Sequence, residues 1–179
     1  MFKGLKNKSI NKAVESHLQQ RESYTKAIKL NKMAVLIDAR YDIDILSVMK
    51  LSSRLGVKPK NVKIIGLKQV KSKSHLEGEA ESASYFDESQ IAYSGSFKSN
   101  TLKDFTNEQY DVLINFYKSD IPNLNLIAAA SKAKFKVGFA DVDNRINDLV
   151  IGTAPDNIDL FISELKKYLK ILNIIWVTF

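Results

Sequence analysis

Residues 110–145 read YDVLINFYKSDIPNLNLIAAASKAKFKVGFADVDNR, and this stretch decides the fold class. It contains two short apolar runs, DVLINFY (residues 111–117) and KFKVGF (residues 134–139), on either side of an alanine-rich segment that begins at Pro122. Apolar runs of this length with little alternation are typical of strands buried on both faces. Proline suits the first turn of a helix. The stretch therefore predicts a strand, a helix and a second strand.

A similar unit precedes this stretch. The runs MAVLIDA (residues 33–39) and VKIIGL (residues 62–67) are short and apolar, as expected of buried strands. Between them, residues 41–56 place apolar side chains at helical spacing, and Gly56 suits the left-handed position that follows a helix end. Two strands joined by a helix run parallel with a right-handed crossover. We therefore expect a mainly parallel sheet.

Three segments are patterned less strongly. Residues 9–30 predict a helix with Ser9 as its N-cap and a thin apolar stripe. The polar residues 70–90 predict a long loop. Residues 91–97 (IAYSGSF) fit a short strand at the edge of the sheet.

Two further elements complete the predicted fold. Residues 148–151 (DLVI) predict a last strand, and residues 154–172 predict an amphipathic helix. The apolar face expected for this helix consists of Ile158, Phe161, Leu165, Tyr168, Leu169 and Leu172. The order of elements indicates an α/β three-layer sandwich with a mainly parallel, Rossmann-like sheet and a basic N-terminal helix. At 179 residues the chain suits one domain, so we divide it into a basic helical extension (residues 1–32) and a single α/β domain (residues 33–179).

Composition excludes several classes of function. The chain has no cysteine, which rules out disulfides, thiolate metal sites and cysteine nucleophiles. His17 and His75 are the two histidines, and neither has an acid and a nucleophile at a recognisable spacing. The glycine-rich phosphate loops and the usual hydrolase motifs are missing, which favours a non-enzymatic role. No apolar run approaches the roughly 20 residues of a membrane span, and the start lacks a secretory signal, so we expect a cytoplasmic protein.

Positive charge is concentrated in the first 73 residues. Residues 1–32 contain eight lysines and arginines against Glu15 and Glu22, a net charge of +6, and residues 58–73 contain six lysines and no acid. Residues 74–111 contain eight acids against two lysines, a net charge of −6. Such asymmetry in a chain of net charge +7 favours an acidic partner, although a solvated lysine-rich face is a common alternative.

We therefore expect a binding protein whose basic N-terminal third docks on an acidic partner, with RNA or a ribonucleoprotein such as the ribosome as the leading candidate. Phosphate contacts need lysine and arginine side chains on one accessible face. Neither basic region interleaves the aromatic side chains that would stack on bases, so the contact would depend on shape and phosphate charge. The candidate residues are Lys6, Lys8, Lys12, Arg21, Lys26, Lys58, Lys60, Lys63, Lys68, Lys71 and Lys73.

A second hypothesis places a small molecule or a nucleotide phosphate at the carboxyl ends of the strands, where open α/β sheets bind ligands. Polar residues end or follow three of the predicted strands, and two serines flank a glycine in residues 91–97. The candidate ligand-binding residues are Asp38, Ser94, Gly95, Ser96, Asn115 and Asp141. Oxygen ligands of this kind suit Mg²⁺, but acids after strands more often cap the next helix or loop. We therefore expect no metal ion and no cofactor.

A third hypothesis is a subunit of a larger protein assembly. The narrow-striped N-terminal helix and the apolar tail IIWVTF (residues 174–179) are the candidate elements for docking a protein partner. The single tryptophan, Trp176, lies in this tail, where anchoring the segment is a commoner role than stacking on a base.

Five segments of the chain are also similar to known proteins. They are NVKIIGLK (residues 61–68), YDVLINFY (residues 110–117), SKAKFKVGF (residues 131–139), RINDLVI (residues 145–151) and ELKKYLKILN (residues 164–173). On these segments the chain resembles a family of short, uncharacterised proteins from Bacteroidetes, chiefly flavobacteria, a domain of unknown function. The resemblance covers nearly the whole chain from the basic N-terminal helix onward. It implies the α/β fold and implies no activity, cofactor or site residue.

Residues 110–139 also resemble, more distantly, one half-domain of heptosyltransferase-type glycosyltransferases, which likewise runs strand, alanine-rich helix, strand. Those enzymes need two such domains with a cleft between them, and this chain has the length of one. The likeness therefore implies the fold and not the activity.

Overall fold

The computed structural model describes residues 2–22, 27–41, 45–69, 83–153 and 156–175. Within them lies a six-stranded sheet of order β3-β2-β1-β4-β5-β6, in which every pairing is parallel. The strands are β1 (Met33–Asp38), β2 (Val62–Leu67), β3 (Ala83–Phe86), β4 (Val112–Phe116), β5 (Phe135–Phe139) and β6 (Leu149–Ile151). The helices are α1 (Phe2–Gln19), α2 (Ile45–Arg54), α3 (Asn100–Asn107), α4 (Pro122–Ala130) and α5 (Ile158–Ile171), with short 3₁₀ helices η1 (Pro59–Asn61) and η2 (Glu88–Gln90).

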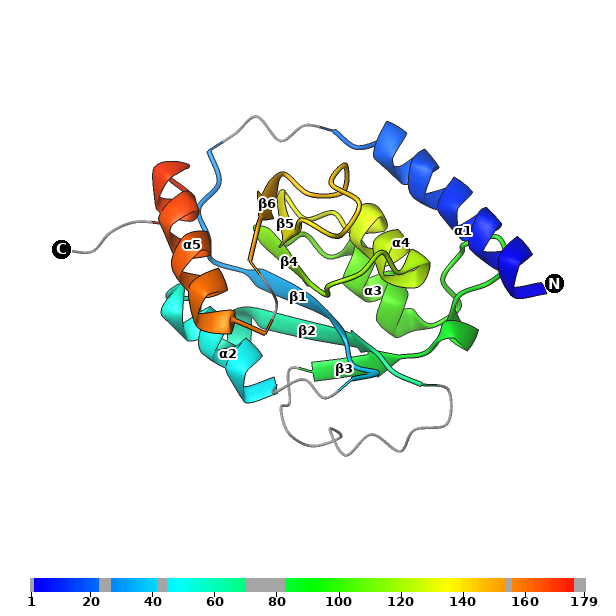
Figure 1. Ribbon diagram of the computed structural model, residues 1–179, viewed down its shortest axis with the longest axis horizontal. Coiled ribbons are helices and arrows are strands. Elements are labelled where there is room, and N and C mark those ends of the chain that lie inside the picture. The colour runs from blue at the N-terminus through cyan, green and yellow to red at the C-terminus, as the bar shows by residue number, and fades with distance from the viewer. Residues whose placement is uncertain (1, 23–26, 42–44, 70–82, 154–155, 176–179) are drawn as a thin grey trace.

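Helices cover both faces of the sheet (Figure 1). α1, α3 and α4 lie on one face, which we call the α4 face, and α2 and α5 lie on the other, the α5 face. Side chains of each strand alternate between the two layers, so that Leu36 points to the α4 face and Ile37 to the α5 face. The predicted α/β three-layer sandwich with a Rossmann-like sheet is confirmed, and the described sheet is wholly parallel.

The central strands form because their residues are apolar on both sides. Every residue of β1 and β4 is buried, which matches the nearly continuous apolar runs that predicted them. Met33 at the start of β1 is in register with Val62 of β2 and Val112 of β4, so the three strands begin together. The two β-α-β units predicted from sequence are therefore confirmed, including Gly56, whose φ of 79° follows the end of α2.

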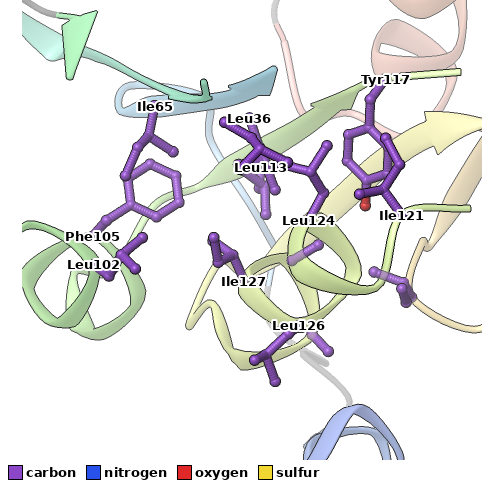
Figure 2. Packing of buried hydrophobic residues seen from close by; sticks show 14 of the residues in the cluster. Leu36, Ile65, Leu102, Phe105, Leu113, Tyr117, Ile121, Leu124, Leu126 and Ile127 are labelled. Atoms are coloured by element: carbon purple, nitrogen blue, oxygen red, sulfur yellow. The ribbon is translucent and has the colours of Figure 1, made fainter. Parts of the chain in front are cut away.

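The helix α4 occupies the centre of its layer. Figure 2 shows Leu124 and Ile127 directed toward Leu36 and Leu113 of the sheet, whereas Leu126 points away from the sheet, toward α1. Residues 123–129 are all buried, because α1 covers the outer side of α4. A helix that is apolar on all sides is expected in such a position.

The prediction of a helix over residues 9–30 is wrong at both ends. α1 spans Phe2–Gln19, so Ser9 lies inside the helix and does not cap it. Arg21, two residues after the end of the helix, binds the segment before β6. Its guanidinium donates to the Ile146 carbonyl (3.0 Å) and to the Asp148 carboxylate (2.5 Å). Its apolar stripe is narrow, but Ile10 and Val14 are buried in the core of the α4 face.

The region between β2 and β4 also differs from the prediction. Residues 83–86, expected in a loop, form the edge strand β3, in which Phe86 alone is buried. Residues 91–97, expected as a strand, form a tight turn closed by a single antiparallel bridge between Ile91 and Phe97. The helix α3 was not predicted, because its eight residues give too short an apolar pattern.

The closing helix α5 was predicted, but the residues assigned to its buried apolar face are partly wrong. Phe161, Leu165 and Leu169 are buried as expected, and Ile162 joins them. Tyr168 and Leu172 were expected on the buried face but are exposed. None of the described helices is long and apolar enough to cross a membrane.

Candidate nucleic-acid interface

Lysines from distant parts of the sequence meet at one edge of the sheet. In a parallel sheet every segment that leads into a strand lies at the same edge, which we call the amino edge. The segments that enter β1, β2 and β5 are rich in lysine. The amino-edge lysines are Lys29, Lys32, Lys58, Lys60, Lys63, Lys132 and Lys134.

Contacts between these segments show that they lie side by side. The Asn61 side chain before β2 donates a hydrogen bond to the Asn31 side chain before β1 (3.2 Å). The backbone N–H groups of Asn31 and Lys32 both donate to the carboxylate of Asp111, which precedes β4 (3.0 and 2.8 Å). Lys134 before β5 forms an ion pair with the same carboxylate (2.6 Å). The amino ends of β2, β1, β4 and β5 are thus joined by polar contacts.

Two carboxylates, Glu108 and Asp111, lie among the amino-edge lysines, and each forms an ion pair with one of them. A hydrogen bond from Lys32 lowers the pKa of Glu108, and the Tyr110 hydroxyl and the charge of Lys63 contribute in the same direction. Burial by itself would raise the pKa of Asp111, but hydrogen bonds from Lys134 and from two backbone N–H groups lower it overall. Both groups are therefore held as anions by lysines of the fold.

Of the five remaining amino-edge lysines, four are available to a partner. Lys29, Lys58, Lys60 and Lys132 are exposed, and their side chains form no ion pair within the described part of the chain. Seven lysines and two carboxylates give this edge a net charge of +5. Strands lie about 4.8 Å apart, so the amino ends from β2 to β5 span roughly 14 Å. Exposed ammonium groups spread over such a length suit the phosphates of a polymer more than one small anion.

The structure divides the basic residues proposed from sequence between several places. Lys58, Lys60 and Lys63 lie at the amino edge, whereas Lys68 follows β2 at the opposite, carboxyl end. Arg21 is engaged with Asp148. Lys26, Lys71 and Lys73 lie outside the described residues.

The lysines of α1 belong to another surface. Figure 1 shows α1 and the segment of η1 on opposite sides of the molecule. Lys8 and Lys12 are exposed on α1, and Lys6 donates to the Glu88 carbonyl (2.7 Å) beside the ring of Tyr93. The lysines of α1 therefore do not form one patch with the second basic region, whereas Lys29 and Lys32 of the first basic region lie beside it at the amino edge.

Four amino-edge lysines were not among the candidates proposed from sequence. Lys29 and Lys32 lie in the basic region 1–32 but were not selected, and Lys132 and Lys134 belong to a short lysine-rich run (SKAKFK, residues 131–136) outside the two regions of high net charge. The signal that finds them is positional, since each lies within a few residues of the start of a predicted strand.

The carboxyl-edge residues of the small-molecule hypothesis are mostly engaged within the fold. Asp38 forms a two-pronged ion pair with Arg40 (both contacts 2.8 Å). Asn115 is fully buried and donates to the Asn147 side chain (2.7 Å), a partner that the sequence did not suggest. Asp141 is exposed after β5.

The turn around Gly95 serves to dock α1. A Cβ atom built on Gly95, which has a φ of 85°, would lie 2.7 Å from the Cβ of Ala13, so the turn and α1 touch at this glycine. The hydroxyls of Ser94 and Ser96 are 2.9 Å apart and face solvent. The geometry gives this turn a packing role, and it does not bring Ser94, Gly95 and Ser96 into contact with Asp38 or Asn115.

Two other predictions concern single residues. His17 is half-buried, and burial together with the nearby charge of Lys136 lowers its pKa. His75 and Trp176 lie outside the described residues. Within the residues that the structure describes, no three acidic or histidine side chains are grouped so as to hold a metal ion.

Comparison with known proteins places the chain in a family without assigning a function. Residues 6–172 match a family of unknown function (DUF6913), and the chain belongs to this family. No curated protein and no solved structure matches the chain.

Proposed function

We propose that this protein is a non-enzymatic binding protein that docks an acidic polymer, RNA or a ribonucleoprotein, on the amino-edge lysines. One observation carries the proposal: lysines from three segments distant in sequence meet at one edge, where the two carboxylates are already neutralised. Four exposed ammonium groups are left for phosphates. Since exposed lysines act as point charges, such binding would be strongly salt-dependent and weakly sequence-dependent.

Removing three of the exposed lysines should weaken RNA binding. We expect the triple variant Lys58→Gln, Lys60→Gln and Lys132→Gln to bind a labelled single-stranded RNA less tightly, as measured by fluorescence anisotropy over a series of salt concentrations. Each phosphate contact with a single strand contributes about 0.7 to the slope of log K against log[salt], so the slope should fall by about 2.

A matched control variant distinguishes the loss of the amino-edge lysines from a loss of net charge. The triple variant Lys8→Gln, Lys12→Gln and Lys103→Gln loses the same charge from exposed positions on α1 and α3 and should retain most of the binding. Equal losses in the two triple variants would mean that binding follows net charge alone. Absence of salt-dependent binding by the unaltered protein at low ionic strength would remove the proposal.

The strand order favours a second candidate, binding of a small molecule. Ligands of doubly wound sheets bind outside the carboxyl ends of the strands where the order reverses, and here that point lies between β1 and β4, beside Asp38. A thermal-shift panel of nucleotides, sugar phosphates and Mg²⁺ tests this candidate, because a ligand of the native state raises Tm. No rise across the panel would count against it.

A further inference from the structure

The helix α5 carries apolar side chains that its own sheet does not cover. Leu160, Tyr168, Ile171 and Leu172 are 46%, 37%, 65% and 49% exposed, respectively. They account for half of the eight large hydrophobic side chains that are exposed in the described residues. The apolar surface of α5 is thus wider than the part that packs on the sheet.

Helix geometry places these side chains together on one side of α5. At about 100° per residue, the exposed apolar residues fall in one arc that adjoins the buried arc of Phe161, Leu165 and Leu169. α2 lies on the side of α5 away from the exposed arc. Its Arg54 forms an ion pair with Asp159 (2.5 Å), and Asp159 lies about 100° from Leu160 around the helix, in the direction opposite to the exposed arc. The α5 face has two described helices and the α4 face has three. The exposed arc therefore lies where no described helix neighbours α5.

The charges along α5 are arranged by sign. Asp159 and Glu164 lie in its first half, and the lysines lie in its second half. The three lysines are Lys166, Lys167 and Lys170. Of these charges, Glu164 and Lys167 lie in or beside the exposed arc, where they pair with each other (3.5 Å), whereas Asp159, Lys166 and Lys170 lie on the other side of α5. An antiparallel partner with the same sequence would bring Glu164 of each copy toward Lys167 of the other, whereas a parallel copy would bring like charges together.

We propose that α5 is a self-association surface, on which α5 of a second copy of this chain lies antiparallel, with a two-fold axis that crosses the exposed arc at the level of residues 165 and 166 along the helix. In that register Leu160 of each copy lies opposite Ile171 and Leu172 of the other. Glu164 of each copy lies near Lys167 of the other. A two-fold contact uses the same patch twice, and this patch is complementary to itself in both apolar pattern and charge. A single pair of helices buries less than about 1,000 Å², so the dimer is weak and forms at high protein concentration.

Sedimentation velocity over a concentration series tests the proposal. The variant Leu160→Asp with Ile171→Asp should weaken self-association at least about tenfold, because it places charges in the apolar contact. Both residues are exposed in the monomer, so the variant should keep its fold, which circular dichroism checks. The control Leu5→Asp with Tyr93→Asp alters equally exposed apolar residues elsewhere and should self-associate as the unaltered protein does.

A charge exchange tests the antiparallel register. Glu164→Lys and Lys167→Glu, each alone, bring like charges together across the two-fold axis and should weaken self-association. An equimolar mixture of the two variants should associate again, because each mutant residue then faces its opposite charge. A monomer at every concentration, or association that Leu160→Asp with Ile171→Asp leaves intact, would overturn the proposal. Failure of the mixture to associate would overturn the antiparallel register.

Discussion

Gly138→Ala is expected to destabilise the protein by about 2–4 kcal/mol, although alanine normally suits a strand interior better than glycine. A Cβ atom built on Gly138 would lie 2.4 Å from the Nδ2 atom and 2.8 Å from the Cγ atom of Asn147. Asn147 is held there because its Oδ1 atom accepts a hydrogen bond from Asn115, a fully buried side chain in β4. The added methyl group must push Asn147 aside and leave the Asn115 amide without this partner, which costs about 1–3 kcal/mol besides the overpacking.

Urea denaturation with two controls measures this effect. Gly152→Ala adds a methyl group where no atom lies within 4 Å and should change the free energy of unfolding by less than about 0.5 kcal/mol. In an Asn147→Ala background the clash is gone, so Gly138→Ala should cost much less than in the unaltered protein. An equal cost in both backgrounds would show that Asn147 is not the reason for the glycine.

The parts of the fold that could be predicted from sequence are those buried on two sides. β1, β2, β4 and β5 each lie between two layers of helices, so nearly every residue is apolar and the pattern identifies the strand. β3 lies at an edge with one buried residue, and its sequence ASYF is indistinguishable from loop. Just after the end of α1, Arg21 forms an ion pair with Asp148, which is 127 residues away in the chain, and no local sequence pattern predicts such a contact.

The candidate interface could be predicted from sequence only in part, because contacts between distant segments decide which lysines it contains. Net charge along the sequence identified Lys58, Lys60 and Lys63, which are close together in the chain. It also grouped them with lysines of α1 that lie on another surface, and it missed Lys132 and Lys134 before β5. Charge counted along a chain ignores topology, whereas a parallel sheet gathers the residues that precede its strands.

The loop between β5 and β6 has a structural role that the sequence pattern does not reveal. Arg145 forms hydrogen-bonded ion pairs with Asp143 in its own loop and with Glu15 of α1. These contacts join the loop after β5 to the N-terminal helix. They are tertiary contacts between exposed or half-buried groups, which hydrophobic periodicity does not predict.

The stability of the protein is expected to rise between about pH 7.5 and about pH 9.5 because of Lys136. This lysine is 1% exposed, and its Nζ atom donates to the carbonyls of Ala128 (2.7 Å) and Ala129 (3.1 Å) at the end of α4. Burial, and then the nearby charge of Arg21, lower its pKa to about 7, although Asp148 acts in the opposite direction. An unfolded lysine has a pKa of about 10.4. Between these two values the unfolded chain binds the proton that the folded protein has lost, so raising the pH favours folding by up to about 1.4 kcal/mol per pH unit.

Urea denaturation at several pH values in this range measures the free energy of unfolding. Its pH dependence distinguishes the contribution of Lys136 from those of the other titrating groups. Burial raises the pKa of Tyr110 and of Tyr117, so these two tyrosines make stability fall only where unfolded tyrosine ionises, above about pH 10. The pKa of His17 is lowered, so its titration lies below the range. Lys136→Met removes the titrating group while keeping the buried stem and should flatten the rise, whereas Lys132→Met, at an exposed position, should leave it unchanged. If the Lys136→Met curve ran parallel to that of the unaltered protein, Lys136 would be charged throughout, held so by the carbonyl groups at the end of α4.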